Sequence, residues 1–312
     1  MTEPFIRPDV KSLLAMLAAS GQPPYHELTP AEARAMRKAS KIETEPPVGE
    51  LGMVRDLSCP GPAGAIPLRL FDVRAERRPG DVIMFTHGGG FVFGDLDTHA
   101  ALCAEVSRQM DLPVIAVDYR LAPEAPFPAA PDDAIAAARW IAANGAMTGR
   151  EAKRLIVMGD SAGANLAIVV AVALRDQPAA VPVAAQCLIY PVTDTCKKEG
   201  SGLEFGDGYF LTQDAMEWFD SHYRPVSEDW RRNPFVAGLA GLPPAVIMTA
   251  SLDPLRDQGR ALAGGLAAVG GEVVYLEARG TIHAFWTLRA LLPSSAADVA
   301  RCLAHLELMV AA

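Results

Sequence analysis

Cysteine is scarce in this chain, and its pattern excludes two common uses of the residue. Five cysteines occur among 312 residues, which is an odd number, and no C-x-x-C pair is present. Disulfide frameworks and cysteine-based zinc sites need even or closely spaced sets of cysteines. The sequence therefore predicts reduced thiols, as in cytoplasmic proteins, and we expect neither a metal nor another cofactor.

Positive charge and long apolar runs are also lacking. With 28 basic and 37 acidic residues the formal net charge is -9, which argues against nucleic acid or an anionic membrane surface as partner. The longest apolar stretch, 164–174, is shorter than the about twenty residues that cross a bilayer. The apolar run 13–20 follows acidic as well as basic residues, so it predicts one face of an amphipathic helix rather than a signal peptide. We expect a small-molecule partner and no membrane insertion.

Half of the residues are hydrophobic and only 21% are charged, so the chain can bury a large core. Helical patterns alternate with most of the later apolar runs, which predicts an α/β fold with a mostly parallel eight-stranded sheet covered by helices on both faces. The expected strands lie near residues 51–57, 66–73, 82–86, 113–118, 155–159, 185–190, 245–250 and 272–277.

The most informative motif is GDSAG at residues 159–163, between an apolar strand-like run and a helix-like run. A serine in such a sharp strand-to-helix turn is exposed at the end of the sheet, and the flanking glycines leave room for the turn. The N-terminus of the following helix can stabilise an oxyanion at the same place. Ser161 is therefore a candidate nucleophile, although a helix start with a capping serine would have the same local pattern.

A second glycine-rich motif, HGGGF at residues 87–91, follows the apolar run 82–85. Three consecutive glycines let backbone N–H groups approach a ligand closely, because no side chain intervenes. Beside a nucleophile, such a loop can supply an oxyanion hole together with the N–H of Ala162. The alternative is an ordinary strand-to-helix turn, and the motif at 159–163 favours the functional interpretation.

A serine nucleophile needs a base and an acid that orients the base. Among the six histidines, His283 follows the last strand-like run, and Asp253 follows the run 245–250. Asp257 is the rival acid, but it falls inside a helix that begins after Pro254, where the helix dipole favours a negative charge. The chain order of serine, aspartate and histidine is the one expected of an α/β-hydrolase.

The segments 87–95, 118–124, 159–163 and 253–257 together resemble the bacterial hormone-sensitive lipase family of carboxylesterases, and specifically its GDSAG subgroup. The resemblance runs from about residue 80 to the C-terminus. It implies Ser161 as nucleophile, His283 as base and Asp253 as orienting acid. The implied oxyanion hole consists of N–H groups from Gly88, Gly89, Gly90 and Ala162. Two departures from the family, Ala284 and Ala164 in place of glycines, bear on substrate fit rather than on reacting atoms.

Two segments break the alternation, residues 1–48 and 192–240, and the resemblance implies that they pair as a helical cap over a catalytic domain of residues 49–191 and 241–312. Long excursions from a compact domain are usually functional. The second segment is rich in large side chains, namely Phe205, Tyr209, Phe210, Met216, Trp218, Phe219, Tyr223 and Trp230. We expect most of them to form the core of the cap and one or two to face an acyl pocket. The resemblance also implies a homodimer formed through the last strand and helix.

Two further side chains are expected to support the loops of the site. Arg120 is predicted to be an anchor paired with Asp160 or Glu124, because charges this close to a sheet must be paired. His99 is predicted to pack under the glycine-rich loop.

The sequence thus predicts a serine carboxylesterase that hydrolyses short- to medium-chain acyl esters through an acyl-enzyme. An amidase or formamidase would use the same three residues. A lipase acting on long chains and a ligand receptor without catalysis are further alternatives, since a fold does not fix a function.

Overall fold

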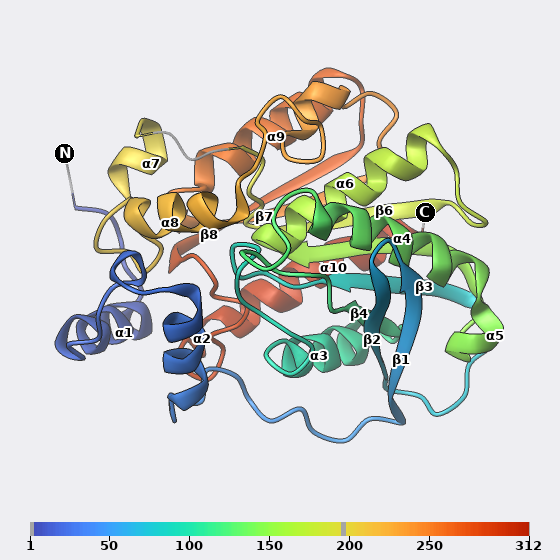
Figure 1. Ribbon diagram of the computed structural model, residues 1–312, viewed down its shortest axis with the longest axis horizontal. Coiled ribbons are helices and arrows are strands. Elements are labelled where there is room, and N and C mark those ends of the chain that lie inside the picture. The colour runs from blue at the N-terminus through green and yellow to red at the C-terminus, as the bar shows by residue number, and fades with distance from the viewer. Residues whose placement is uncertain (1–2, 195–197, 312) are drawn as a thin grey trace.

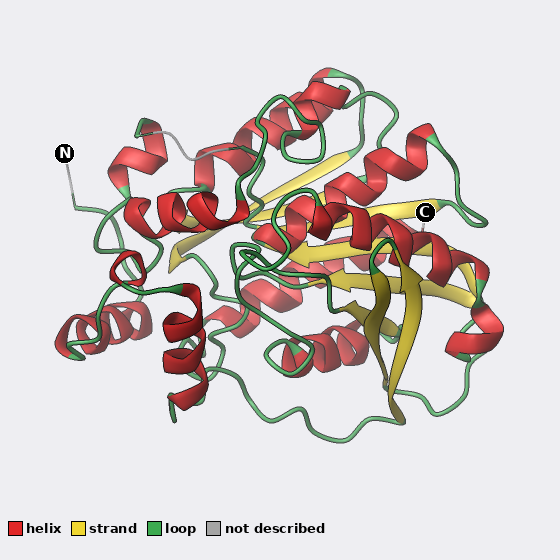
Figure 2. Ribbon diagram, in the orientation of Figure 1, coloured by secondary structure: helices red, strands yellow, loops and turns green. Residues whose placement is uncertain are grey.

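The computed structural model describes residues 3–194 and 198–311, which are built around one eight-stranded sheet. Its strand order is β1-β2-β4-β3-β5-β6-β7-β8 (Figure 2). The β1–β2 and β2–β4 pairs are antiparallel, and all later neighbours are parallel. The strands are β1 (Met53–Gly61), β2 (Gly64–Asp72), β3 (Gly80–Thr86), β4 (Val114–Val117), β5 (Ala152–Asp160), β6 (Val183–Ile189), β7 (Ala245–Leu252) and β8 (Val273–Ile282). The predicted mostly parallel eight-stranded sheet is confirmed.

Helices cover both faces of this sheet (Figure 1). One face carries α4 (Ala129–Ala143), α6 (Ala162–Asp176) and α9 (Arg256–Ala268), and the other carries α3 (Ala100–Met110) and α10 (Ser295–Ala311). The short helix α5 (Gly145–Thr148) leads into β5. None of the helices within residues 3–194 and 198–311 is long and apolar enough to cross a membrane.

Strand β3 shows why the central strands have continuous apolar sequences. Its side chains Val82 and Met84 belong to the hydrophobic cluster on one face of the sheet, and Ile83 and Phe85 belong to the cluster on the other face. Successive side chains of a strand point to opposite faces, so a strand covered on both sides must be apolar at every position.

Two excursions leave the sheet and pack against each other. The first contains α1 (Pro8–Ala19), the short helix η1 (Tyr25–Glu27) and α2 (Pro30–Ala39); the second contains α7 (Gly200–Glu204), α8 (Gln213–Tyr223) and η2 (Pro234–Ala237). The Nε1–H of Trp218 in α8 donates to the carbonyl of Leu28 at 2.9 Å, and its ring stacks on Tyr25. Helices α1, α2, α7 and α8 accordingly lie together at the left of Figure 1.

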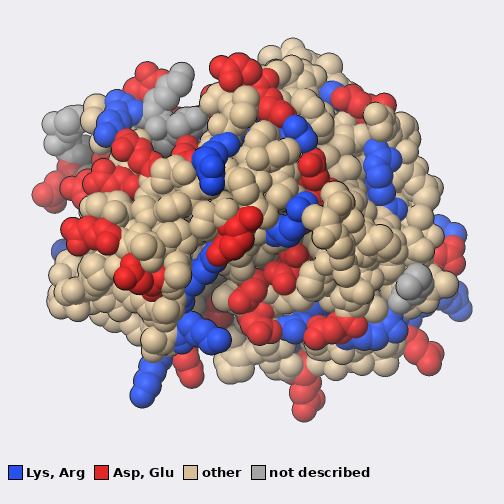
Figure 3. Space-filling view, viewed as in Figure 1, with Lys and Arg blue, Asp and Glu red and all other residues tan. Residues whose placement is uncertain are grey.

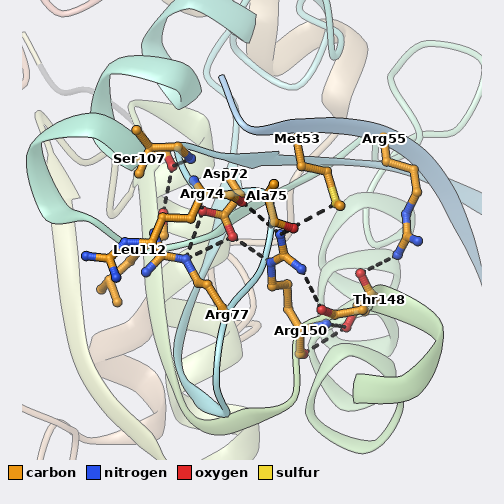
Figure 4. A network of polar contacts seen from close by, with 12 residues as sticks. Met53, Arg55, Asp72, Arg74, Ala75, Arg77, Ser107, Leu112, Thr148 and Arg150 are labelled. Carbon is orange, nitrogen blue, oxygen red and sulfur yellow. Dashed lines mark hydrogen bonds and ion pairs between the residues drawn. The ribbon is translucent and has the colours of Figure 1, made fainter. Parts of the chain in front are cut away.

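A buried ion network stabilises the amino ends of the parallel strands (Figure 4). Asp72, at the end of β2, has no exposed surface and accepts from Arg77 Nε at 2.8 Å and from Arg150 Nε at 2.5 Å. Arg77 precedes β3 and Arg150 precedes β5, so the network lies at the end of the sheet opposite to the carboxyl ends of these strands. Charges buried this deeply persist only when they are paired.

Candidate active site

Ser161 lies in the tight turn between β5 and α6. Its backbone has φ 54° and ψ -118°, a region that residues other than glycine rarely adopt, and its N–H donates to the carbonyl of Ile189 at 2.8 Å. Such strain persists only where the surrounding structure imposes it. The turn directs the serine away from the sheet at the carboxyl end of β5.

The two glycines of the motif are required by close packing around the turn. A Cβ atom on Gly163 would lie 1.9 Å from the carbonyl oxygen of Thr86, and one on Gly159 would lie 2.4 Å from the backbone of Gly163. The G-x-S-x-G spacing therefore follows from the contact between the turn and β3. The predicted strand, sharp turn and helix are confirmed.

The structure brings Ser161, His283 and Asp253 together from the ends of β5, β8 and β7. The Nε2 atom of His283 lies 2.9 Å from Ser161 Oγ, and its Nδ1 atom lies 2.7 Å from Asp253 Oδ2. Asp253 is completely buried, and His283 is nearly so. An ionised carboxylate can only accept, so Nδ1 carries the proton and Nε2 is free to accept the proton of the serine.

Asp253 is itself fixed on both carboxylate oxygens. Its Oδ1 accepts the N–H of Leu255 at 2.8 Å while Oδ2 bonds the imidazole. Asp257, the alternative acid, lies in the first turn of α9 and bonds Arg256 and Ser201 instead. The expectation that Asp257 is a first-turn charge of a helix is confirmed.

The structure corrects the prediction for Gly88 in the glycine-rich loop. The N–H of Gly88 donates to Asp160 Oδ1 at 2.8 Å, so it is already used and does not face an incoming oxyanion. Burial raises the pKa of Asp160, but His99 and the Gly88 N–H outweigh burial and lower it, so this carboxylate stays ionised. Its role is to hold the loop in place.

The N–H groups of Gly89 and Gly90 remain candidates, and the carbonyls that share their peptide planes are fixed. His87 Nδ1 lies 2.9 Å from the Gly88 carbonyl, and the N–H groups of Val92 and Phe93 donate to the Gly89 carbonyl at 3.1 and 2.8 Å. In a trans peptide the N–H points opposite to the carbonyl, so both N–H groups have set directions. Ala162 is the first residue of α6, so its N–H has no hydrogen-bond acceptor within the helix.

His87 is a buried residue whose role the sequence did not reveal. Burial, with a smaller effect of His99, lowers its pKa to about 4, so the ring is neutral and Nδ1 donates to the carbonyl. Its ring stacks on Tyr119 with centroids 4.3 Å apart, and His99 packs beside it at 5.4 Å. The expected position of His99 under the loop is confirmed. The only sequence signal for His87 was its place at the start of the motif.

Arg120 has a different partner from the one predicted. Its guanidinium forms a bidentate pair with Asp133 of α4, with Nε–Oδ2 and Nη2–Oδ1 distances of 2.8 Å. The two predicted partners are engaged elsewhere: Asp160 lies 3.3 Å from His99 Nε2, and Glu124 pairs with Arg34 at 2.7 Å. Arg120 is an anchor, but it anchors the loop after β4 to α4.

An aromatic side chain of the second excursion lies directly on the glycine-rich loop. A Cβ atom on Gly90 would lie 2.4 Å from the ring of Phe219 in α8. This ring also contacts Phe93 and Trp218, with centroids 5.3 Å apart in both pairs. The excursion thus places an aromatic wall next to the candidate oxyanion donors.

Comparison with known proteins places the chain in a family. A family model described as alpha/beta hydrolase fold matches residues 83–287. The chain belongs to the α/β-hydrolases of the hormone-sensitive lipase type. It is 43% identical to the carboxylic ester hydrolase LipN of Mycobacterium tuberculosis over 78% of this chain and 67% of that protein. It is 34% identical to an ethyl acetate hydrolase of Pseudomonas putida over 92% of this chain and 94% of that protein.

Solved structures of other α/β-hydrolases are also similar to the chain. An enzyme from the metagenome of Lake Arreo has a TM-score of 0.91 at 38% identity, covering 98% of both chains. A thermostable esterase from Pseudomonas putida has a TM-score of 0.92 at 31% identity, covering 99% of both. Such identities over most of the chain show that this hydrolase is a carboxylic ester hydrolase.

The hydrolase offers no metal centre within its described residues, where no group of three or more His, Cys, Asp or Glu side chains could hold an ion. Acidic and basic side chains are interspersed on the face shown in Figure 3.

Proposed function

We propose that Ser161 is the nucleophile, His283 the general base and Asp253 the acid that orients it. The observation that carries this proposal is the continuous hydrogen-bonded chain from Ser161 Oγ through the imidazole to a buried carboxylate. His283 removes the proton of Ser161 as the hydroxyl attacks the ester carbonyl, and then donates it to the leaving alcohol. Water repeats the sequence on the acyl-enzyme and releases the acid.

The negative oxygen of each tetrahedral intermediate is bound by the N–H groups of Gly89, Gly90 and Ala162. The fixed carbonyls of the loop support this assignment, because they set the direction of the N–H groups before the substrate arrives. Donors organised in advance stabilise the transition state without reorganisation, and one such donor contributes about 3–4 kcal/mol.

The substrates are short- to medium-chain acyl esters. The Phe219 ring lies against Gly90, which supports an acyl site that is closed on one side and therefore limits the length of the acyl chain. A relative that is named an ethyl acetate hydrolase also supports short-chain substrates. A series of p-nitrophenyl esters from acetate to palmitate tests this range. Matched anilides test the amidase alternative, because an amide needs stronger protonation of its leaving group.

Replacement of the nucleophile tests the mechanism. Ser161→Ala is expected to reduce kcat by about four orders of magnitude or more while the protein stays folded, since only binding and the oxyanion hole remain. A phosphonate inhibitor is expected to label Ser161 alone, which peptide mass mapping would detect. Retention of more than about a tenth of the activity, or a label on another serine, would remove Ser161 from this role.

We infer a division into a catalytic domain of residues 49–191 and 241–312 and a helical cap of residues 1–48 and 192–240. Contacts between the two excursions, such as that of Trp218 with Leu28, support their grouping as one cap. The four described cysteines, Cys59, Cys103, Cys187 and Cys302, are free thiols, which supports a cytoplasmic location.

We also infer a homodimer formed through the last strand and helix. Strand β8 is the end strand of the sheet, and an edge strand offers backbone groups that can pair with another chain. Sedimentation equilibrium tests this inference. A mass of one chain at every concentration would refute it.

A further inference from the structure

The first turn of α9 binds the beginning of the second excursion at two points. Gln258 Oε1 accepts the N–H groups of Thr193 and Asp194 at 2.7 and 3.2 Å. The neighbouring Asp257 Oδ2 accepts the N–H of Ser201 at 2.8 Å. Consecutive residues of one helix therefore hold two separate parts of this excursion.

Ser201 makes the most specific of these contacts. Its side chain is buried, and its hydroxyl donates to the Pro254 carbonyl at 2.9 Å and accepts the N–H of Asp257 at 3.1 Å. It thus caps a free N–H in the first turn of α9, a role normally filled by a residue of the same helix. Gly200 has φ 50°, and a Cβ there would lie 2.7 Å from Asp257 Oδ2. The close packing of the start of α7 on Asp257 therefore requires glycine at this position.

Arg256 extends the same surface. Its guanidinium lies 5.0 Å from the ring centre of Phe205 and bonds Glu204 at 3.2 Å. Phe205 is buried and Glu204 ends α7, so this contact fixes the end of the helix as Ser201 fixes its start. We call Arg256, Asp257 and Gln258 the α9 dock.

The α9 dock lies next to the candidate acid, and the Arg256 N–H donates to the Asp253 carbonyl at 3.0 Å, but the side chains of the dock do not bond the Asp253 carboxylate. Asp253 is three residues before Arg256, yet its two oxygens are bonded to Leu255 and His283. Loss of the Ser201 contacts therefore leaves both hydrogen bonds of Asp253 in place. The segment that would move is α7 and, beyond it, α8, which carries Phe219 against Gly90.

We propose that the residues of the α9 dock are positioning residues that fix the second excursion over the site and thereby set the affinity for the acyl chain. The proposal rests on the proposed function, in which this excursion is part of the cap. The proposal places longer acyl chains, but not acetate, against the cap. The dock thus acts on substrate binding and on chain-length preference, whereas Ser161, His283 and Asp253 carry out the chemical steps.

The test compares Ser201→Ala and Asp257→Ala with the parent protein on p-nitrophenyl acetate and hexanoate. KM for the hexanoate is expected to rise about fivefold, as for loss of one or two hydrogen bonds, while KM for the acetate rises less than about twofold. The kcat values should stay within about twofold, since the bonds of Asp253 are retained. Asp257→Asn keeps an oxygen acceptor and should raise the KM for the hexanoate less than Asp257→Ala does.

Ser221→Ala is the matched control, because the hydroxyl of Ser221 bonds the Trp218 carbonyl of its own helix. It should leave both KM values unchanged. Equal losses of kcat and kcat/KM on both esters, or reduced thermal stability with unchanged KM values, would overturn the role of the dock. Should Asp257→Ala not fold, Ser201→Ala with an unchanged ratio of the two KM values would overturn the role of the dock. Failure of the proposed function itself would appear instead as activity that survives Ser161→Ala.

Discussion

At the scale of single residues, the two carboxylates near the end of β7 have different surroundings. Asp253 is completely buried and 2.7 Å from the imidazole, whereas Asp257 is partly exposed and shared between Ser201, Arg256 and Arg260. The side-chain hydrogen bonds to Arg256 and the N–H of Ser201 overcome burial and lower the pKa of Asp257, so it stays charged. Only Asp253 is placed to stabilise an imidazolium.

Paired substitutions separate these two carboxylates. Asp253→Asn is expected to lower kcat by about three to four orders of magnitude, because the amide favours the wrong imidazole tautomer. Asp257→Asn should leave kcat within about twofold of the parent value, since the retained oxygen still accepts from Ser201. Steady-state kinetics on p-nitrophenyl acetate measure both effects. The reverse ranking would show that Asp257, rather than Asp253, orients the base.

The sequence could single out Ser161, Asp253 and His283 as candidates, because each follows a recognisable apolar strand. It could not assign the N–H of Gly88, because the partner that occupies it, Asp160, is 72 residues away and its direction depends on the packing of two loops. Ala284, which the sequence marked as a departure from the family, adopts φ 63°. Glycine adopts that conformation more easily, so the residue after the candidate base carries a small strain.

At the scale of elements, the strands were predictable and their ends were not. The apolar part of β5 was expected from residue 155, but the strand begins at Ala152, because Ala152 and Arg154 pair with Gly80 and Asp81 of β3 around a bulge at Lys153. The partner of Arg120 was missed for a related reason. The loop after β4 leads to Asp133 of α4, and local sequence does not show where such a loop ends.

The ion network at the amino ends of β3 and β5 makes a prediction about stability. Asp72→Asn leaves the guanidinium of Arg150 buried without a compensating charge, while Arg77 keeps its ion pair with Asp111. The loss is expected to cost about 3–5 kcal/mol of unfolding free energy. Urea denaturation at pH 7 measures this loss. The kcat of the folded fraction should be unchanged, because the network lies at the opposite end of the strands from Ser161.

Asp111→Asn is the control for this network. Asp111 pairs with Arg74 and Arg77 but is about half exposed, so its loss should cost less than about 1 kcal/mol. Equal effects of the two substitutions would mean that burial of Asp72 does not set its contribution.

At the scale of the whole molecule, the fold class and the two excursions follow from the alternation of strands and helices and its two interruptions. The negative net charge has a local consequence that the sequence did not reveal. Asp118 follows β4, where burial and the charges of Asp95 and Asp97 raise its pKa to about 6 despite Arg69. The opposite shift occurs at His87, whose pKa burial lowers to about 4.

These two shifts have opposite effects on stability as the pH falls. Between about pH 6.5 and 4 the unfolded chain binds a proton at His87 and the folded protein does not, so this residue destabilises the folded state in acid. Between about pH 6 and 4 the folded protein binds a proton at Asp118 that the unfolded chain does not. The contribution of Asp118 is therefore most favourable in acid and is lost as the pH rises through about 6.

Asp118→Asn isolates the second effect. Above pH 7 the substitution removes an ionised carboxylate from a site that disfavours it, and we expect the unfolding free energy at pH 8 to rise by about 1 kcal/mol, a value reduced for the partial exposure of the side chain. At pH 4.5 the carboxyl of the folded parent protein is already protonated, so most of this gain should disappear. Urea denaturation of both proteins at the two pH values measures the difference.

Glu76→Gln removes an exposed charge and should change stability little at either pH. An equal gain from Asp118→Asn at pH 8 and pH 4.5 would assign the effect to side-chain packing instead of protonation.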